Sequence, residues 1–112
     1  MNQTTVIPLS LSKLETTFSR MKNEAGWDTN KPLLWGYFFY DHDKGKLEAL
    51  GEKLDGFDIY PPEKKDNTYI LHIAEKTIHS PQTLLDQCNK LGELAVKNNI
   101  EVFDGWDVGK TL

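Results

Sequence analysis

Asp41, His42 and Asp43 are the side chains whose types most suggest chemistry, because carboxylates and imidazole are common metal ligands. Three successive residues cannot all face one ion in regular structure. An aspartate that precedes an apolar periodic segment is also typical of a helix N-cap. We therefore interpret this segment as a turn between a strand and a helix, with Asp43 as the cap.

The other histidines and the single cysteine form no pattern typical of a metal site or a catalytic site. No two histidines have the i, i+4 spacing that places a pair of ligands on one helix face. Cys88 falls on the apolar stripe of a predicted helix, where a buried and unreactive thiol is expected. The sequence therefore predicts no metal, no cofactor and no internal disulfide.

The glycines and serines form no motif of nucleotide binding or acyl transfer. Gly109, Lys110 and Thr111 are similar to the end of a phosphate-binding loop, but the first glycine of that motif and the following helix are missing. No serine stands in a Gly-x-Ser-x-Gly elbow. We therefore expect that the protein is not an enzyme.

Composition indicates one ordinary folded domain with an acidic balance. The chain has 112 residues, 38% of them hydrophobic and 27% charged, and its formal net charge is −4. This charge disfavours nucleic acid as the main ligand and is compatible with a basic protein partner. There is no signal-peptide pattern and no apolar run of membrane-spanning length, so we expect a cytoplasmic protein without membrane contact.

Residues 33–40 (LLWGYFFY) are the longest apolar and aromatic run, and the predicted elements are arranged around them. The run is short and bounded by polar residues, which favours a strand over a helix. One face of this strand would carry Leu33, Trp35, Tyr37 and Phe39, and the other face is also apolar. A strand that is apolar on both faces is expected in the middle of its sheet.

Capping and periodicity predict three helices and three further strands. A capping box from Ser12 to Glu15 and a stop at Gly26 predict the first helix, and Ser80 followed by proline predicts the start of the last. The predicted elements after the first strand are a helix with a Leu47, Leu50 and Leu54 stripe, strand 57–60, polar loop 63–67, strand 68–75, a helix from 81 to 97 and strand 100–106.

This order predicts an α+β fold of the ferredoxin-like kind. Two split β-α-β units would form a four-stranded antiparallel sheet of order 4-1-3-2, with the helices that begin near Asp43 and Ser80 on one face. We expect residues 1–31 to form a lead-in and an extra helix, and residues 32–112 to form the ferredoxin-like domain. The extra helix would cover part of the open sheet face or meet a partner.

Two segments together carry a family resemblance. In one, residues 35–40 (WGYFFY) precede an aspartate-rich turn and a leucine-spaced helix; in the other, 91–95 (LGELA) precede 100–106 (IEVFDGW). With both segments the chain resembles the RraB family, whose members inhibit ribonuclease E, over about residues 35–108. The resemblance implies a ferredoxin-like fold, no catalysis, and binding of the basic, non-catalytic scaffold region of ribonuclease E rather than of RNA.

Asp104, Gly105 and Trp106 also have a physical interpretation. Gly105 allows a bulge or a close backbone approach near the end of the strand, Asp104 can accept backbone hydrogen bonds, and Trp106 can pack on the sheet face that carries Trp35. The motif then either locks the last strand to the first or forms an aromatic patch for a partner. The candidate protein-binding residues are Trp35, Gly36, Tyr37, Phe39, Asp104, Gly105 and Trp106.

An RNA-binding module is the alternative. Residues 36–39 (GYFF) are superficially similar to the aromatic signature of RNA-recognition motifs, which stack bases on exposed strand aromatics. The leading basic residue is missing, the segment falls on the first predicted strand, and the third offers only Tyr69. No tight binding to RNA is therefore expected.

Overall fold

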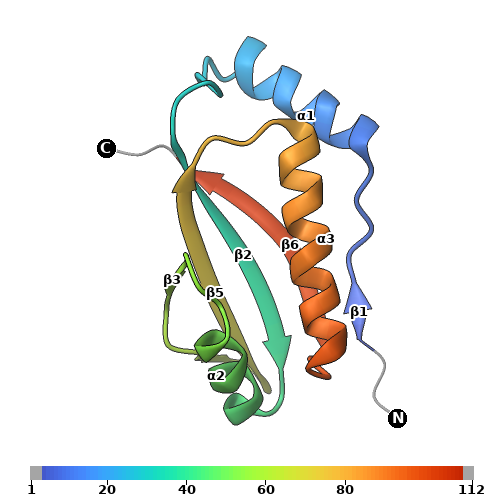
Figure 1. Cartoon of the computed structure of the whole chain (residues 1–112), viewed down its shortest axis with the longest axis vertical. Coiled ribbons are helices and arrows are strands. Elements are labelled where there is room, and N and C mark those ends of the chain that lie inside the picture. The colour runs from blue at the N-terminus through green and yellow to red at the C-terminus, as the bar shows by residue number, and fades with distance from the viewer. Residues whose placement is uncertain (1–3, 110–112) are drawn as a thin grey trace.

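The structure is a computed structural model and describes residues 4–109. Within this range the chain forms three helices and six strands (Figure 1). Their bounds are β1 Thr5–Val6, α1 Leu11–Asn23, β2 Leu33–Asp41, α2 Lys44–Glu52, β3 Asp58–Ile59, β4 Glu63–Lys65, β5 Thr68–Thr77, α3 Pro81–Lys97 and β6 Val102–Gly109.

The strands form one mixed sheet with β2 in its middle (Figure 1). The order is β1-β6-β2-β5-β3, and β4 also pairs with β5. β2 is antiparallel to both β5 and β6, whereas the edge strand β1 is parallel to β6. The sheet is therefore larger than the four-stranded antiparallel sheet that the sequence predicted, and it is not antiparallel throughout.

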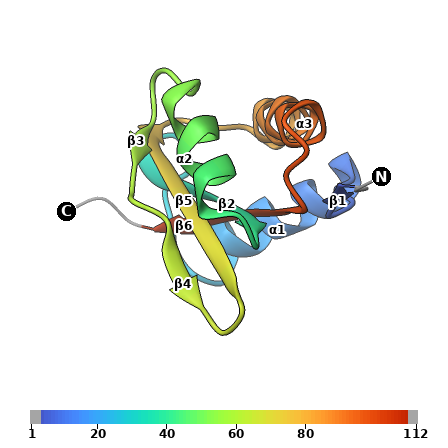
Figure 2. The ribbon, with the colours of Figure 1, turned by 90° about the horizontal axis from the view of Figure 1, so that it is seen from below.

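The position of β2 follows from its side chains, as predicted. Trp35, Tyr37 and Phe39 point to one face and are 0% exposed. That face is packed against α2 and α3, which lie on the same side of the sheet (Figure 2). The alternate side chains of β2, Phe38 and Tyr40 among them, point to the opposite side and are partly exposed. We call that opposite side the open face.

The caps of α2 and α3 confirm two sequence predictions. The Asp43 carboxylate accepts hydrogen bonds from the backbone N–H groups of Gly45 and Lys46, which begins α2. Ser80 and Thr83 form a capping box at the start of α3, with proline in the first turn.

The first helix begins at a different cap from the one predicted. Its N-cap is Ser10, whose side chain accepts from the N–H of Lys13, while Ser12 lies inside the first turn. Phe18 stacks on Trp35 at 5.7 Å between ring centroids, and α1 lies across the end of α3 (Figure 1). The helix therefore closes one end of the core, and it does not cover the open face.

Two strands were missed because they are short and carry no hydrophobic pattern. Residues 63–67, predicted as a polar loop, contain β4, whose three residues are charged and exposed. Asp66, in the left-handed region at φ 55°, turns the chain directly into β5. β1 was predicted as part of a loose lead-in, and the backbone pairing of Thr5 with Glu101 places it in the sheet.

Candidate functional site

Three aromatic rings, one each from β2 and β5 and one from the residue after β3, stack in a row across the open face. The Phe38 and His72 ring centroids are 4.6 Å apart, and those of His72 and Tyr60 are 4.9 Å apart. Phe38 and His72 are register partners on β2 and β5, and the Tyr60 N–H donates to the His72 carbonyl beyond the end of β3. We call Phe38, His72 and Tyr60 the aromatic row.

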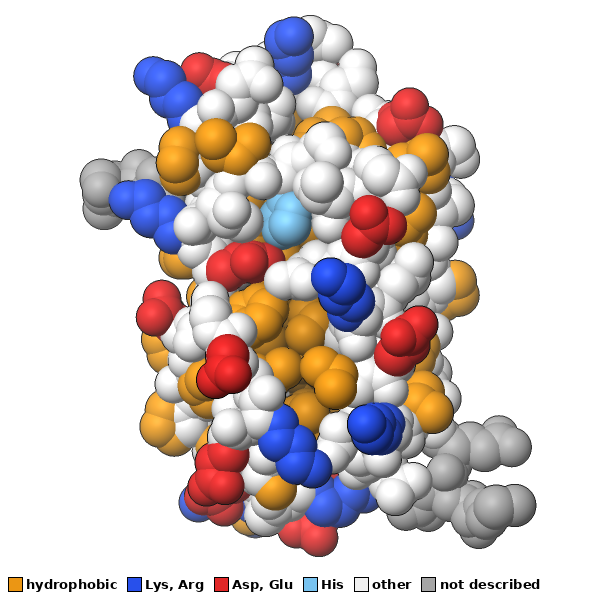
Figure 3. Space-filling view, viewed as in Figure 1, with side chains coloured by type: hydrophobic (Ala, Val, Ile, Leu, Met, Phe, Trp, Pro, Cys, Tyr) orange, Lys and Arg blue, Asp and Glu red, His pale blue; other side chains and the backbone are white. Residues whose placement is uncertain are grey.

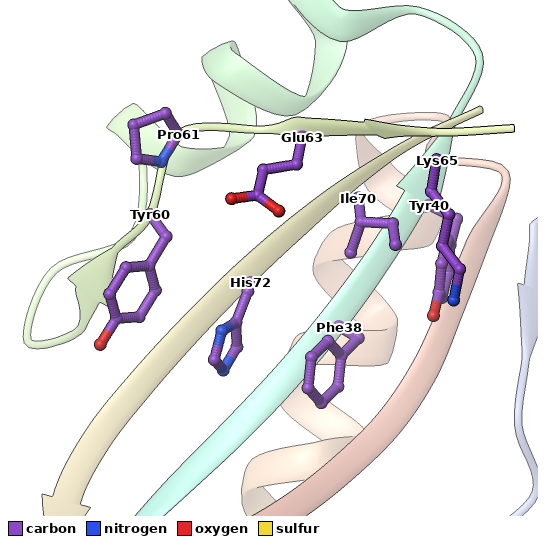
Figure 4. A pocket seen from close by; sticks show the side chains of 8 residues that line it. All are labelled: Phe38, Tyr40, Tyr60, Pro61, Glu63, Lys65, Ile70 and His72. Atoms are coloured by element: carbon purple, nitrogen blue, oxygen red, sulfur yellow. The ribbon is translucent and has the colours of Figure 1, made fainter. Parts of the chain in front are cut away.

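A pocket of about 340 Å³ lies beside the aromatic row. In Figure 4 the Glu63 carboxylate points from β4 into the space between Tyr60 and Ile70, and Lys65 lies near Tyr40. The lining residues are Phe38, Tyr40, Tyr60, Pro61, Glu63, Lys65, Ile70 and His72. Its volume is at the small end of the range for ligand sites, roughly 300–1,000 Å³.

Among the residues that the structure describes, carboxylates outnumber ammonium groups around the aromatic row. The strand register places Asp107, Gly36, Ala74 and Asp58 side by side across the sheet. Gly36 lies two residues before Phe38 on β2, so this row is on the same face of the sheet as Phe38. The charged residues that the strand register and the pocket lining put on the open face are Asp58, Glu63, Asp104 and Asp107 against Lys65 and Lys76.

Gly36 makes room for two of these side chains. A Cβ atom added there would collide with the Asp107 carboxylate and would lie 2.7 Å from the Nε2 atom of His72. Because glycine has no side chain, both groups can lie close over β2. The predicted candidate Gly36 thus contributes to the open face by leaving space for the side chains of Asp107 and His72.

The other predicted residues of β2 lie on the opposite, helix-bearing face. Trp35, Tyr37 and Phe39 are fully buried in the core, so their side chains have no exposed area for a partner. The Trp35 indole N–H donates to the Thr77 carbonyl at 3.0 Å. These three residues position the open face through the packing of β2.

The Asp104, Gly105 and Trp106 motif forms the predicted bulge. Two residues, Asp104 and Gly105, stand opposite Phe38, and Gly105 has the left-handed φ of 87°. Trp106 packs 5.6 Å from Trp35 between ring centroids, as predicted. Asp104 is exposed and Trp106 is partly exposed.

The structure gives Asp104 a partner that the sequence did not predict. Burial, and then the charge of Asp104 and a hydrogen bond to it, raise the pKa of the Tyr40 phenol. The Tyr40 hydroxyl therefore remains a donor toward this carboxylate. This contact ties the bulge of β6 to the edge of the pocket.

A buried polar network underlies the helix-bearing face. The Tyr37 hydroxyl donates to Glu75 Oε2 at 2.6 Å, the Gln87 amide donates to the same oxygen at 3.1 Å, and His79 Nε2 lies 3.1 Å from it. Burial by itself would raise the pKa of Glu75, but the hydrogen bonds from His79, Tyr37 and Gln87 lower it overall. Burial, followed by the bond to Glu75, raises the pKa of the Tyr37 phenol far above its usual range.

The lowered pKa of Glu75 predicts that the protein loses stability in acid. Because its folded pKa lies below the ordinary value of 4.5, its contribution is full above that value and is lost as the pH falls through the folded pKa. The urea midpoint of the wild-type protein should fall as the pH is lowered below about 5, and that of Glu75→Gln should fall less steeply. Glu93→Gln, an exposed change on α3, should keep the wild-type slope. Equal slopes for all three proteins would contradict the assignment.

Asp41 joins the end of β2 to α2 and to the start of β6. Its carboxylate accepts from the N–H of Asp43 at 2.7 Å and of Glu101 at 3.0 Å, and Lys46 Nζ lies 3.0 Å away. Burial raises the pKa of Asp41, but these contacts outweigh it and lower the pKa overall. Residues 41–43 therefore form the strand-to-helix turn that the sequence predicted.

No group of three histidine, cysteine, aspartate or glutamate side chains in the described part of the chain could hold a metal ion. Cys88 is buried, as predicted, and burial followed by the charge of Glu75 raises the pKa of its thiol to about 12. A thiol of this kind is a poor nucleophile at neutral pH.

Three residues of the aromatic row and its pocket were not predicted as candidates from the sequence: Tyr60, Glu63 and His72. The alternation of β5 could have placed His72 opposite the buried Leu71 and Ile73, and hence beside Phe38. No local signal marks Glu63, because its strand has no apolar residue.

Figure 3 shows the helix-bearing side of the molecule, opposite the open face. Hydrophobic side chains gather in the middle of that side, and charged side chains surround them.

The fold and the site together define a small α+β protein. Its helices pack on one face of the sheet, and the other face carries aromatic side chains with carboxylates around them. The family described as Regulator of ribonuclease activity B matches residues 13–108, which is most of the chain. The chain therefore belongs to the RraB family, as the sequence resemblance indicated. No curated protein matches the chain.

Membership of this family supports a regulatory role and implies a protein partner in general. None of the helices in residues 4–109 has the length and apolar character needed to cross a membrane.

Proposed function

We propose that this protein inhibits a ribonuclease E-type endonuclease by binding its basic, non-catalytic scaffold region, and that it does so in the cytoplasm without catalysis of its own. Family membership over residues 13–108 is the observation that carries the proposal. The net charge of −4 supports it, because an acidic protein attracts basic segments. Among the predicted site residues, Asp104 and Trp106 keep exposed surface for such a partner.

The proposed mechanism is occupancy. Basic segments that recruit RNA to the enzyme would be covered by an acidic surface, so that RNA reaches the active site less often. Long-range attraction speeds association and weakens as salt rises, while short-range contacts set the rate of dissociation. Inhibition should therefore depend on the scaffold region and decrease with ionic strength.

A cleavage assay with two forms of the enzyme tests this proposal. The protein should slow RNA cleavage by the full-length endonuclease and leave cleavage by its isolated catalytic domain unchanged, because only the former carries the scaffold region. The control is the catalytic domain on the same RNA without the protein. Equal inhibition of both forms would place the target at the active site, and inhibition of neither would remove this enzyme as the partner.

RNA binding remains a second candidate, supported by the partly exposed aromatic row. Base stacking on strand aromatics is a common mode of single-strand recognition. The carboxylates around the row oppose this candidate, because phosphates would approach them.

We also propose that the sheet is an extended ferredoxin-like arrangement. The succession β6, β2, β5 and β3 supports this view, with β1 and β4 as additions. The buried residues of α1 share the core of β2, which supports treating the N-terminal helix as part of the same folding unit.

A further inference from the structure

We propose that the open face binds an arginine-bearing basic segment of a protein partner, with one guanidinium group seated in the pocket beside the aromatic row. The inference rests on the proposed function and deepens it, because it assigns the surface and the chemistry by which a basic partner is recognised.

The aromatic row suits a planar cation. A guanidinium group stacks on aromatic faces, whereas an ammonium group is a compact and strongly hydrated point charge. Tyr60, at the outer end of the row, is 43% exposed, and the pocket of about 340 Å³ opens next to it. Figure 4 shows Tyr60 and His72 on one side of this space and Ile70 beside it. An arginine side chain can thus lay its methylene stem on Ile70 and its head group beside the rings.

Glu63 supplies the charge that the rings lack. Its carboxylate points into the pocket (Figure 4), where it can accept two parallel N–H bonds from a guanidinium group. Lys65 lies at the far end of the pocket, near Tyr40, and leaves the Tyr60 end to Glu63. The arrangement therefore selects arginine at one end of the pocket.

The surrounding charges complement a basic segment rather than a nucleic acid. Asp58 and Asp107 lie in the neighbouring row, and Asp104 stands opposite Phe38 on the bulge of β6. Successive basic residues of a bound segment would meet these carboxylates. The phosphates of an RNA strand would meet the same carboxylates, and within residues 4–109 the strand register and the pocket lining place only Lys65 and Lys76 on this face to neutralise them.

Fluorescence anisotropy tests the inference directly. The probes are a labelled peptide of alternating arginine and glycine, its lysine counterpart of equal length and charge, and labelled single-stranded oligouridine RNA. The wild-type protein should bind the arginine peptide about threefold or more tightly than the lysine peptide, the scale expected for exposed cation–π contacts. It should bind the RNA weakest of the three.

Two substitutions locate the site. Tyr60→Leu and Glu63→Gln should each weaken arginine-peptide binding by about threefold, because the first removes a ring and the second a charge without a change of shape. Both residues are exposed, so the fold should survive, which circular dichroism can check. Glu93→Gln on α3 removes the same charge from the opposite side of the sheet and should leave binding unchanged.

The outcomes separate this inference from the proposed function. Equal binding of both peptides, or no effect of Tyr60→Leu and Glu63→Gln, would overturn the arginine site, as would RNA binding that is tighter than peptide binding. If the variants bind the arginine peptide about threefold more weakly but the wild-type protein does not inhibit the endonuclease, the site stands and its partner is another basic protein. If both variants inhibit the full-length endonuclease as well as the wild type does, the enzyme is bound through a different surface and the inference fails.

Discussion

Replacing Trp35 by alanine is expected to lower the free energy of unfolding by about 3–5 kcal/mol, the usual range for a buried tryptophan. The indole is 0% exposed and packs against Phe18, His79 and Trp106, so its removal leaves a cavity between α1, the segment just before α3, and β6. Such a loss is a large part of the free energy of unfolding of a small domain, which is typically about 5–15 kcal/mol. Urea denaturation followed by circular dichroism measures it.

The control for Trp35→Ala is Trp35→Phe, which keeps an aromatic ring and loses the hydrogen bond to the Thr77 carbonyl. Its loss should be smaller, because one hydrogen bond contributes about 1 kcal/mol. A urea midpoint for Trp35→Ala equal to that of the wild type would show that the core tolerates the cavity.

Replacing Asp41 by alanine is expected to lower the free energy of unfolding by about 2–4 kcal/mol, because it removes a buried acceptor of two backbone N–H groups, and an unsatisfied buried donor costs about 1–3 kcal/mol. The Asp41 side chain is 2% exposed, and its loss leaves the N–H groups of Asp43 and Glu101 and the ammonium group of Lys46 without this acceptor. Chemical denaturation at neutral pH measures the change.

Asp55→Ala, in the exposed loop after α2, is the matched control and should change stability little. If Asp41→Ala were as stable as this control, the carboxylate would contribute no net stabilisation to the junction of β2, α2 and β6.

Both residues bear on the proposed binding surface, because they affect the position of the open face. Trp35 packs the helix-bearing side of β2 into the core. Asp41 fixes the end of β2, next to Tyr40, which lines the pocket. Because side chains alternate along a strand, packing on one face sets the placement of groups on the other. Variants of either residue should therefore be tested for folding before any loss of partner binding is assigned to direct contact.

The sequence by itself determined those features that depend on residues close together in the chain. The apolar run of β2, the caps Asp43 and Ser80, and the bulge at Gly105 all follow from backbone preferences and spacings within a few residues. The family resemblance also rests on short local segments, and the match over residues 13–108 confirms it.

Only the tertiary structure decided which side chains meet across the sheet. Tyr37 and Glu75 are 38 residues apart, Asp41 and Glu101 are 60 apart, and the aromatic row draws one ring from each of three segments. Contacts of this kind depend on strand order and register, which a local pattern does not specify. The exposed strand β4 carries no hydrophobic period at all, and it pairs only because β5 presents a free edge to it. The acidic, aromatic open face is therefore a product of the sheet, since the pairing of strands brings its residues together.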